Sequence, residues 1–228
     1  MVSHPLWFLF AFLRENGWIG AKKVGTRMYT SSLFQSPAAF GSVRDSLEEI
    51  SLHFTFLMRM KSQNLYEHAV RVANFAGATA LHMRLPATEV TLIHYAGLLH
   101  DIGLLTMPNH MLDKYPYFST RELQLYKKHP ELGANMLETN PACQDLIPYI
   151  RFHHERWDGG GYPKHLKTVN IPLGARILSI ASYYDSNIYS SPDFHTKTKS
   201  EVTEAIFAGS GTLFDPEVTI AFLQTLYH

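Results

Sequence analysis

Residues 152–163 read FHHERWDGGGYP and join two adjacent histidines to a run of three glycines. Imidazole is a common ligand of zinc, iron and nickel, and it changes charge near neutral pH. Glycine lets the backbone come close to a bound ligand, and Pro163 stiffens the chain after Tyr162. We interpret the histidines as metal ligands and the glycine-rich loop as a segment that faces a substrate.

Four more side chains of ligand type lie near the predicted ends of helices. His68 is in an early turn, His100 and Asp101 are adjacent at one C-terminus, and His129 is expected to end another helix. Side chains at the ends of helices in a bundle can converge on one point. The candidate ligands, more than one tetrahedral metal needs, are His68, His100, Asp101, His129, His153 and His154.

Six ligands suit two divalent ions that share a bridging carboxylate, and Asp101 is the natural bridge. Two ions roughly 4 Å apart can generate a hydroxide and hold both oxygens of an in-line phosphoryl displacement. The predicted chemistry is therefore metal-assisted hydrolysis of a phosphate ester, with Asp101 in the catalytic position.

Each of these features also has an ordinary interpretation when it is taken alone. A histidine at a helix C-terminus interacts favourably with the helix dipole without any metal, and a glycine run usually forms only a turn. His53, His82 and His94 lie on or beside apolar helical faces, and we interpret them as ordinary polar groups. The metal site is predicted from the combination of positions.

The spacing of apolar residues predicts helices along the chain and no strand. Ser119 with Glu122, and Thr198 with Glu201, have the spacing of a capping box. Prolines that suit the first turn of a helix stand at positions 86, 141, 172 and 216. We expect an all-α helical bundle around a metal site, with residues 1–41 as an aromatic-rich N-terminal extension and residues 42–228 as the helical domain.

The composition limits the ligands and the compartment. The chain has 228 residues, 46% of them hydrophobic, and a formal net charge of +0. No basic field is available to attract a nucleic acid polymer or an anionic membrane, so an anionic ligand needs a local site. Cys143 is the only cysteine, which excludes an internal disulfide and agrees with a cytoplasmic location.

The apolar run Pro5–Leu13 is the one segment that suggests targeting. It is shorter than the roughly 20 residues that cross a bilayer, and it lacks a basic region and a cleavage site. We expect no transmembrane segment. The extension is a candidate surface for a protein partner, and covering the domain's own core is an equal alternative.

Six motifs together resemble the HD-GYP domain, a branch of the HD superfamily of metal-dependent phosphohydrolases. They are HAVRV (68–72), LLHDIG (98–103), KKHPELGANML (127–137), FHHERWDGGGYP (152–163), IPLGARIL (171–178) and FDP (214–216). The resemblance implies an all-helical fold, two or three metal ions such as iron or manganese, and hydrolysis of cyclic di-GMP. It implies that the six residues above bind metal and that Gly161, Tyr162 and Pro163 line the substrate site.

The chain departs from this family at several positions. The resemblance implies a phosphate-binding lysine where Leu104 stands, a metal-binding aspartate where Ser182 stands, and a basic arm that begins at Ser191. Asn64 replaces the glutamate of members that bind a third metal. Asp185, one helical turn after Ser182, is a candidate compensating carboxylate, and the alternative is that it orients a neighbour.

Two hypotheses follow. The first is a phosphodiesterase, with full or impaired activity, that hydrolyses a cyclic dinucleotide with a metal-activated hydroxide. The second is a degenerate domain that has kept the fold and acts as a nucleotide-binding or protein-interaction signalling module. Retention of the six candidate ligands favours the first hypothesis, and the replacements at Leu104, Ser182 and Ser191 favour the second.

Overall fold

The computed structural model describes residues 38–114, 117–189 and 197–227. Its only β pairing within these ranges is an isolated bridge between Ser210 and Phe214. The predicted all-α fold is therefore confirmed. The elements are α2 (Ala38–Lys61), α3 (Gln63–His82), α4 (Ala87–Leu99), η2 (Ile102–Thr106), α5 (Asn109–Leu112), α6 (Thr120–Tyr126), α7 (His129–Leu137), η3 (Pro141–Cys143), α8 (Ile147–Arg151), η4 (Thr168–Asn170), α9 (Leu173–Ile188), α10 (Lys199–Ala208) and α11 (Pro216–Thr225), where η denotes a 3₁₀ helix.

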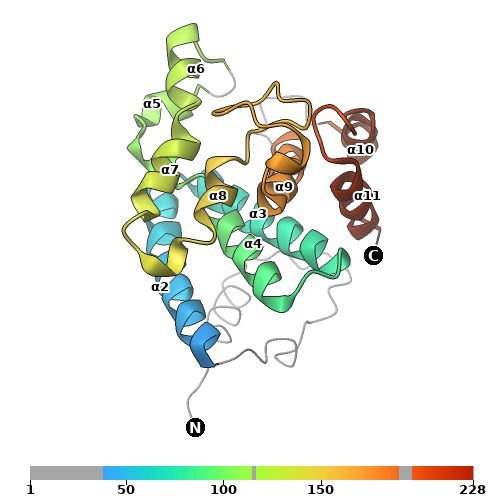
Figure 1. Cartoon of the computed structure of the whole chain (residues 1–228). Helices are drawn as coiled ribbons and strands as arrows, with labels where there is room; N and C mark the ends of the chain where they lie inside the picture. Colours follow the sequence, from blue (N-terminus) through green and yellow to red (C-terminus); the bar gives the residue numbers. More distant parts are fainter. Residues whose placement is uncertain (1–37, 115–116, 190–196, 228) are drawn as a thin grey trace, which may run out of the picture. The chain divides into compact units, whose positions relative to one another are not determined.

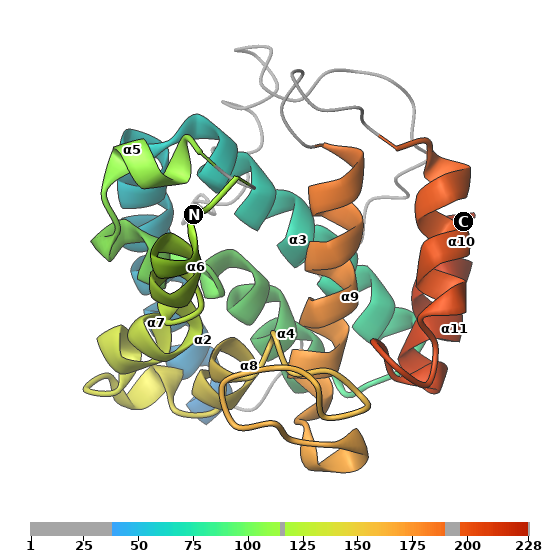
Figure 2. The same cartoon turned by 90° about the horizontal axis from the view of Figure 1, so that it is seen from above.

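Helices α3, α4 and α9 pack against one another at the centre of this domain (Figures 1 and 2). Helix α2 lies along α3 and α4 at one edge, and α10 and α11 lie at the opposite edge beside α9. Ala69, Val72, Ala73 and Ala76 of α3 are fully buried, and these small side chains let the neighbouring helices approach closely.

A short connection makes α3 and α4 antiparallel neighbours, and this places His68 near His100. The chain turns between Met83 and Pro86, so the start of α3 lies beside the end of α4. The centroids of the His68 and His100 rings are 5.2 Å apart. Two residues that are distant in sequence therefore meet because both stand at the same end of a helical hairpin.

The predicted capping boxes are confirmed at α6 and α10. The side chain of Ser119 accepts from the backbone of Glu122, and Thr198 accepts from Glu201, with the reciprocal bond present in both cases. Asp215 caps α11 by accepting from the backbone N–H groups of residues 217 and 218. These bonds satisfy N–H groups that the first turn of a helix leaves without a partner.

The expectation that His129 ends a helix is wrong. Helix α6 ends at Tyr126, and a separate helix, α7, begins at His129. We expected the helix to end at His129 because Pro130 follows it. Proline is also well tolerated in the first turn of a helix, and here Pro130 lies in the first turn of α7. The stretch between α4 and α6 contains η2 and α5.

A close approach of backbones joins η2 to α7. A Cβ atom added at Gly103 would lie 2.1 Å from the carbonyl oxygen of His129 and 2.8 Å from the backbone nitrogen of Gly133. Any side chain at this position would therefore force η2 and α7 apart. Since Asp101 immediately precedes η2 and His129 begins α7, this contact sets the distance between two candidate ligands.

The extension, residues 1–41, lies mostly outside the described residues. Helix α2 begins at Ala38 and passes through the expected boundary at Gly41, so the division of the chain stays a prediction. The run Pro5–Leu13 and the arm that starts at Ser191 also lie outside the described residues. Among the helices that are described, none is long and apolar enough to cross a membrane. The cytoplasmic location stays a prediction.

We predict that Gly103→Ala lowers the free energy of unfolding by about 1–3 kcal/mol, because the added methyl group overlaps backbone that cannot move freely. Denaturant unfolding would measure the change. Gly77→Ala is the matched control, since its added Cβ meets only the side chain of His94 at an ordinary 3.5 Å. In the interior of α3 that control should be neutral or slightly stabilising. Equal effects of both substitutions would contradict the proposed role of the contact.

Candidate metal centre

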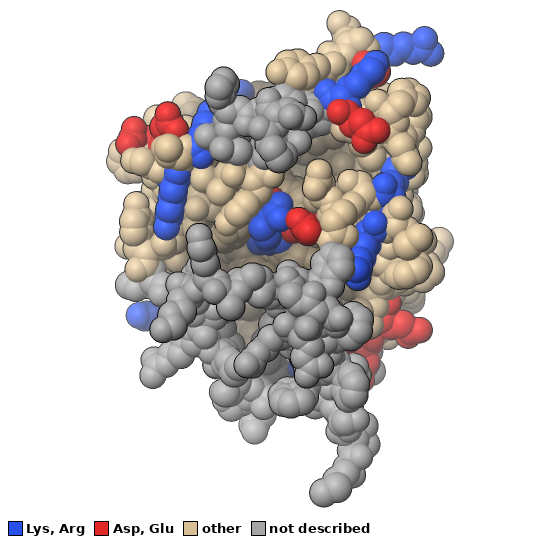
Figure 3. Space-filling model, turned by 180° about the vertical axis from the view of Figure 1, so that it is seen from behind, with Lys and Arg blue, Asp and Glu red and all other residues tan. Residues whose placement is uncertain are grey.

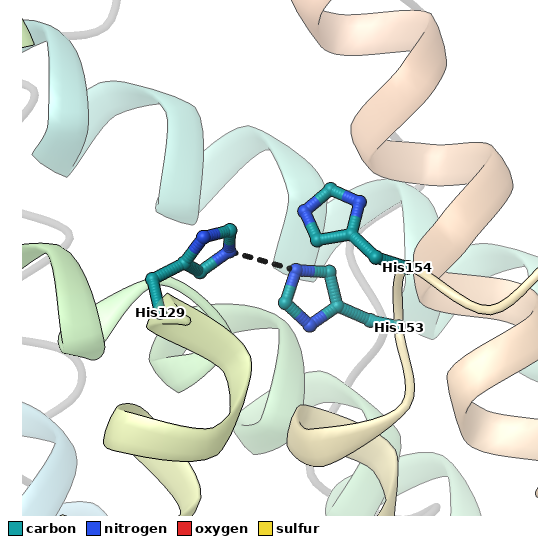
Figure 4. Close-up of side chains that lie close together, drawn as sticks. All are labelled: His129, His153 and His154. Atoms are coloured by element: carbon teal, nitrogen blue, oxygen red, sulfur yellow. Dashed lines mark hydrogen bonds between the residues drawn. The ribbon is translucent and has the colours of Figure 1, made fainter. Parts of the chain in front are cut away.

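The structure brings all six candidate ligands into one cluster, in which four are buried and His68 and His154 are half-buried. Their donor atoms form two groups, each with atoms within 4.8 Å of one another. His68 comes from α3, and His100 and Asp101 follow the last turn of α4. His129 is the first residue of α7, and His153 and His154 follow α8 (Figure 4). The first group is His68, His100 and Asp101, and the second is His129, His153 and His154.

Asp101 lies between the two groups and presents one oxygen to each. Its Oδ2 atom is 3.6 Å from Nε2 of His68 and 3.4 Å from Nε2 of His100. Its Oδ1 atom is 3.0 Å from Nε2 of His129 and 3.8 Å from Nε2 of His153. This is the arrangement that a carboxylate needs in order to bridge two cations.

Backbone carbonyl groups hold three of the imidazole rings by their outer nitrogen. In each case Nδ1 lies within hydrogen-bond distance of the carbonyl oxygen three residues earlier, so Nδ1–H donates and Nε2 keeps its lone pair for the centre. In Figure 4 the His129 and His153 rings point toward each other, and their Nε2 atoms are 3.3 Å apart. The three bonds are His100 to Gly97 at 2.8 Å, His129 to Tyr126 at 2.8 Å and His153 to Ile150 at 2.6 Å.

Asp185 holds the fourth ring, His68. Its Oδ2 atom is 2.7 Å from Nδ1 of His68, on the opposite side of the ring from Asp101. Arg71 donates to both of its carboxylate oxygens, at 2.6 Å and 3.0 Å. Asp185 is fully buried and belongs to neither donor group. This geometry favours the orienting role of Asp185 over the role of a compensating metal ligand.

The pKa values of four residues are shifted so that His100, His153 and His154 are neutral and Asp101 is charged. Desolvation lowers the pKa of His100 to about 4, although the charge of Asp101 opposes it. Desolvation also lowers the pKa of His153 and of His154, and neighbouring histidines add to the effect. For Asp101, desolvation raises the pKa, but His100, His129 and His68 outweigh it and hold the pKa well below 3.8.

These protonation states fit a metal. Metal coordination requires neutral imidazole and ionised carboxylate. The Nε2 atom of His100 is buried and has no hydrogen-bond partner among the described residues. Leaving such an atom unsatisfied costs roughly 1–3 kcal/mol, and a bound cation would remove that cost. The mixed nitrogen and oxygen donors suit a divalent transition metal.

The loop of Gly161, Tyr162 and Pro163 is tied to the second donor group. The Tyr162 ring stacks on His154 with centroids 4.8 Å apart, and the backbone N–H of Tyr162 donates to the carbonyl of His154 at 3.1 Å. Gly161 is needed here because an added Cβ would lie 2.5 Å from that same carbonyl oxygen. The loop therefore lies against one of the candidate ligands, and its role in lining a substrate site stays a prediction.

Glu155 anchors the far end of this loop, and sequence reasoning missed it. Its buried carboxylate accepts from the backbone N–H groups of Lys164 and Leu166, at 2.6 Å and 3.1 Å. Arg71, which holds Asp185, was also missed. A signal was present in both cases: each charged residue stands within three positions of a candidate histidine ligand.

The departures also have defined places in the structure. Leu104 is 5% exposed and belongs to the hydrophobic core. Ser182 is half-buried on α9, one turn before Asp185. Neither can supply the charge that the resemblance assigns to its position.

The comparison with known families agrees with this geometry. The model of the HD domain family matches residues 54–218, which contain all six candidate ligands. This chain belongs to the HD domain family. The HD domain fold thus accounts for the helices from the middle of α2 to α11.

Relatives of this HD domain protein include cyclic dinucleotide phosphodiesterases. It is 32% identical over 187 residues to a cyclic di-GMP phosphodiesterase of Thermotoga maritima, covering 81% of this chain and 51% of that protein. It is 27% identical over 220 residues to the 3′3′-cGAMP-specific phosphodiesterase 2 of Vibrio cholerae, covering 93% of this chain and 41% of that protein. The chain thus spans about half the length of these curated relatives, or less.

A solved structure shares the fold. An HDGYP protein from Bdellovibrio bacteriovorus superposes with a TM-score of 0.61 at 19% identity, covering 100% of this chain and 82% of that one. The resemblance to the HD-GYP branch, predicted from the motifs, is confirmed by these comparisons.

We predict that Asp185→Asn weakens metal binding by roughly 10- to 100-fold, because the amide no longer holds the His68 ring as a carboxylate does. Titration against a competing chelator would measure the affinity, and circular dichroism would check the fold. Asp113→Asn, at an exposed aspartate outside the cluster, is the control and should leave the affinity unchanged. Unaltered affinity in the Asp185 variant would refute the orienting role.

We predict that the metal-free protein loses stability as the pH falls from about 6.5 to about 4. In this window an unfolded chain protonates His100 and the folded chain does not, so the free energy of unfolding drops by about 3 kcal/mol from this residue alone. Asp101 does not offset the loss, since its stabilising charge disappears only below the window. Urea unfolding at about pH 7 and about pH 5 would measure the difference.

His110→Asn, at an exposed histidine, should leave that pH dependence unchanged. A flat stability profile in the unsubstituted metal-free protein would contradict the assignment of neutral, buried histidines.

Proposed function

We propose that this protein is a metal-dependent phosphodiesterase that hydrolyses a cyclic dinucleotide. The observation that carries the proposal is the position of Asp101, whose two oxygens face two different groups of histidines. A lone structural metal would need only one such group. Two groups around one carboxylate suit a centre that acts on phosphate oxygens.

The donors divide between two cation positions. His68, His100 and Oδ2 of Asp101 would hold one ion, and Oδ1 of Asp101 with His129, His153 and His154 would hold the other. Iron and manganese are the candidates that the donor set and the resemblance suggest. When bound, such a pair lowers the pKa of a water molecule and neutralises charge on the phosphoryl oxygens.

The remaining residues would position the substrate. Tyr162 offers an aromatic ring and a hydroxyl beside the centre, and Gly161 and Pro163 shape the loop that carries it. On the face drawn in Figure 3, Lys and Arg side chains are interspersed with Asp and Glu and form no continuous basic field. An anionic substrate on such a surface depends on a few specific contacts and on the cations.

The substrate class comes from the relatives. Proteins that this chain resembles are named for cyclic di-GMP and for 3′3′-cGAMP. Both compounds are cyclic dinucleotides with two phosphodiester bonds, so we assign cyclic dinucleotides as the substrate class of this chain. The assay decides which nucleobases it prefers.

A second candidate function is binding without efficient turnover. Ser182 leaves the first cation position with three donors, whereas the second position has four, so the two are unequal. Leu104 lies in the core and supplies no cation to a phosphate. A domain that holds one metal firmly and a second weakly would bind a nucleotide but cleave it slowly.

We predict that Ser182→Asp raises the metal content from between one and two ions per chain to two, and increases turnover at limiting metal. The added carboxylate restores the metal-binding aspartate that the resemblance implies at this position. The test is anaerobic hydrolysis of cyclic di-GMP and 3′3′-cGAMP with Fe(II) or Mn(II), with the metal counted on the same samples. Ser186→Asp, one turn further along α9, is the matched control.

The phosphodiesterase proposal fails if neither form releases linear or mononucleotide product at saturating metal. Equal metal content in both forms would instead remove the argument for unequal positions. Leu104→Lys is a poorer probe, because it places a charged group at a buried core position and is expected to destabilise the fold.

A further inference from the structure

An exposed apolar face on α2 has no role in the centre described above. Leu52, Phe56 and Met60 are 47%, 61% and 71% exposed and succeed one another at intervals of four residues. Leu57 extends the same face. This is the densest group of exposed large apolar side chains in the described part of the chain, since the others lie scattered over different elements. A cluster of this kind marks an interaction site more often than a scatter of single residues does.

The opposite face of α2 accounts for the helix's place in the fold and cannot explain the exposed one. Leu47, Ser51 and Met58 are buried against α3, α4 and η2. Figure 1 shows α2 along one edge of the domain, with these partners on its inner side. The outward residues therefore add nothing to the core of the domain.

A groove lies beside the first half of the same helix. It has a volume of ≈ 390 Å³ and is lined by Ser46, Glu49, Ile50, His53, Phe54 and Asn140. The protruding apolar residues occupy positions 52–60, whereas the groove occupies positions 46–54 and the end of the α7–η3 connection. One helix thus carries a set of apolar projections and, displaced by about a quarter of its length, a hollow that could receive them.

The charges along the helix are also divided, with acidic residues in its first half and a basic residue in its second half. The exposed acidic residues Asp45 and Glu49 stand on the outward face of the first half. Arg59 flanks that face in the second half, with its guanidinium 5.9 Å from the centre of the Tyr66 ring. If a second α2 runs antiparallel with a two-fold axis near Phe54, Leu52 of one copy meets Phe56 of the other. Glu49 then meets Arg59, and Leu57 and Met60 lie over the groove.

We propose that this face of α2 binds a second copy of the chain in a two-fold symmetric, antiparallel pair. The occupant is a second copy because the projections, the charges and five of the six groove residues are on the same helix, so the surface is self-complementary as an isologous interface requires. One helix pair buries an area near the low end of specific interfaces, roughly 1,000 Å². The pair therefore forms in a concentration-dependent equilibrium.

Sedimentation equilibrium of the full chain over a wide concentration range tests the proposal. We expect a monomer–dimer equilibrium, and we expect Phe56→Glu to raise the dimer dissociation constant by roughly tenfold or more, because it charges the centre of the interface. Phe207→Glu is the matched control, since Phe207 is 70% exposed on α10 and should not alter association. A monomer at every concentration overturns the proposal, whether or not another segment or protein covers α2.

Cysteine cross-linking tests the antiparallel register. The native Cys143 is fully buried, so a short bifunctional thiol reagent should act only at an introduced cysteine. His53→Cys, close to the proposed axis, should cross-link into dimers. Met60→Cys should not, because its two copies would lie roughly 18 Å apart along the helix axis. Efficient cross-linking at position 60, or none at position 53, overturns the arrangement.

Discussion

The ionised carboxylate of Asp101 is the interaction on which the rest of the centre depends. A buried charge of this kind is costly unless opposite charge and hydrogen-bond donors surround it. Here four imidazole nitrogens lie within 3.8 Å of its oxygens. Three of these histidines, His100, His129 and His68, hold the pKa of Asp101 well below the ordinary value. A cation bound between the carboxylate and the rings would compensate this buried charge further.

Around this carboxylate the helices act mainly by fixing the orientation of rings. In three histidines the carbonyl group three residues earlier, in the preceding turn, holds Nδ1, so local backbone geometry decides which nitrogen faces inward. His68 stands in an early turn of its helix, and a carboxylate from α9 takes over the task. That carboxylate, Asp185, is itself fixed by Arg71. Charged side chains thus orient the one ring for which no backbone carbonyl group does so.

The departure from the family at Ser182 lies on one side of the centre. Ser182 stands where the resemblance implies a metal-binding aspartate, while the donor group of His129, His153 and His154 has all of its predicted members. The loop beside the second position is also intact, with Tyr162 stacked on His154. This departure and the retained donors therefore fall on different sides of Asp101.

Much of the fold and the ligand set could be predicted from the sequence because their causes are local. Apolar spacing, capping residues and helix-opening prolines depend on neighbours within a few positions, and they located the helices and both capping boxes. The family motifs named all six residues of the cluster. The start of α7 at His129 was missed because Pro130 suits either side of a helix boundary.

The remaining features depended on contacts between residues far apart in the chain. The sequence could not show that Asp185 faces the outer nitrogen of His68, since that contact spans 117 positions and rests on how α9 packs against α3. Nor could it show that Glu155 closes the substrate loop or that Leu104 is buried. Local patterns determined which side chains were available for chemistry. Only the tertiary structure decided which atom of each side chain faces the centre, because helix packing sets those directions.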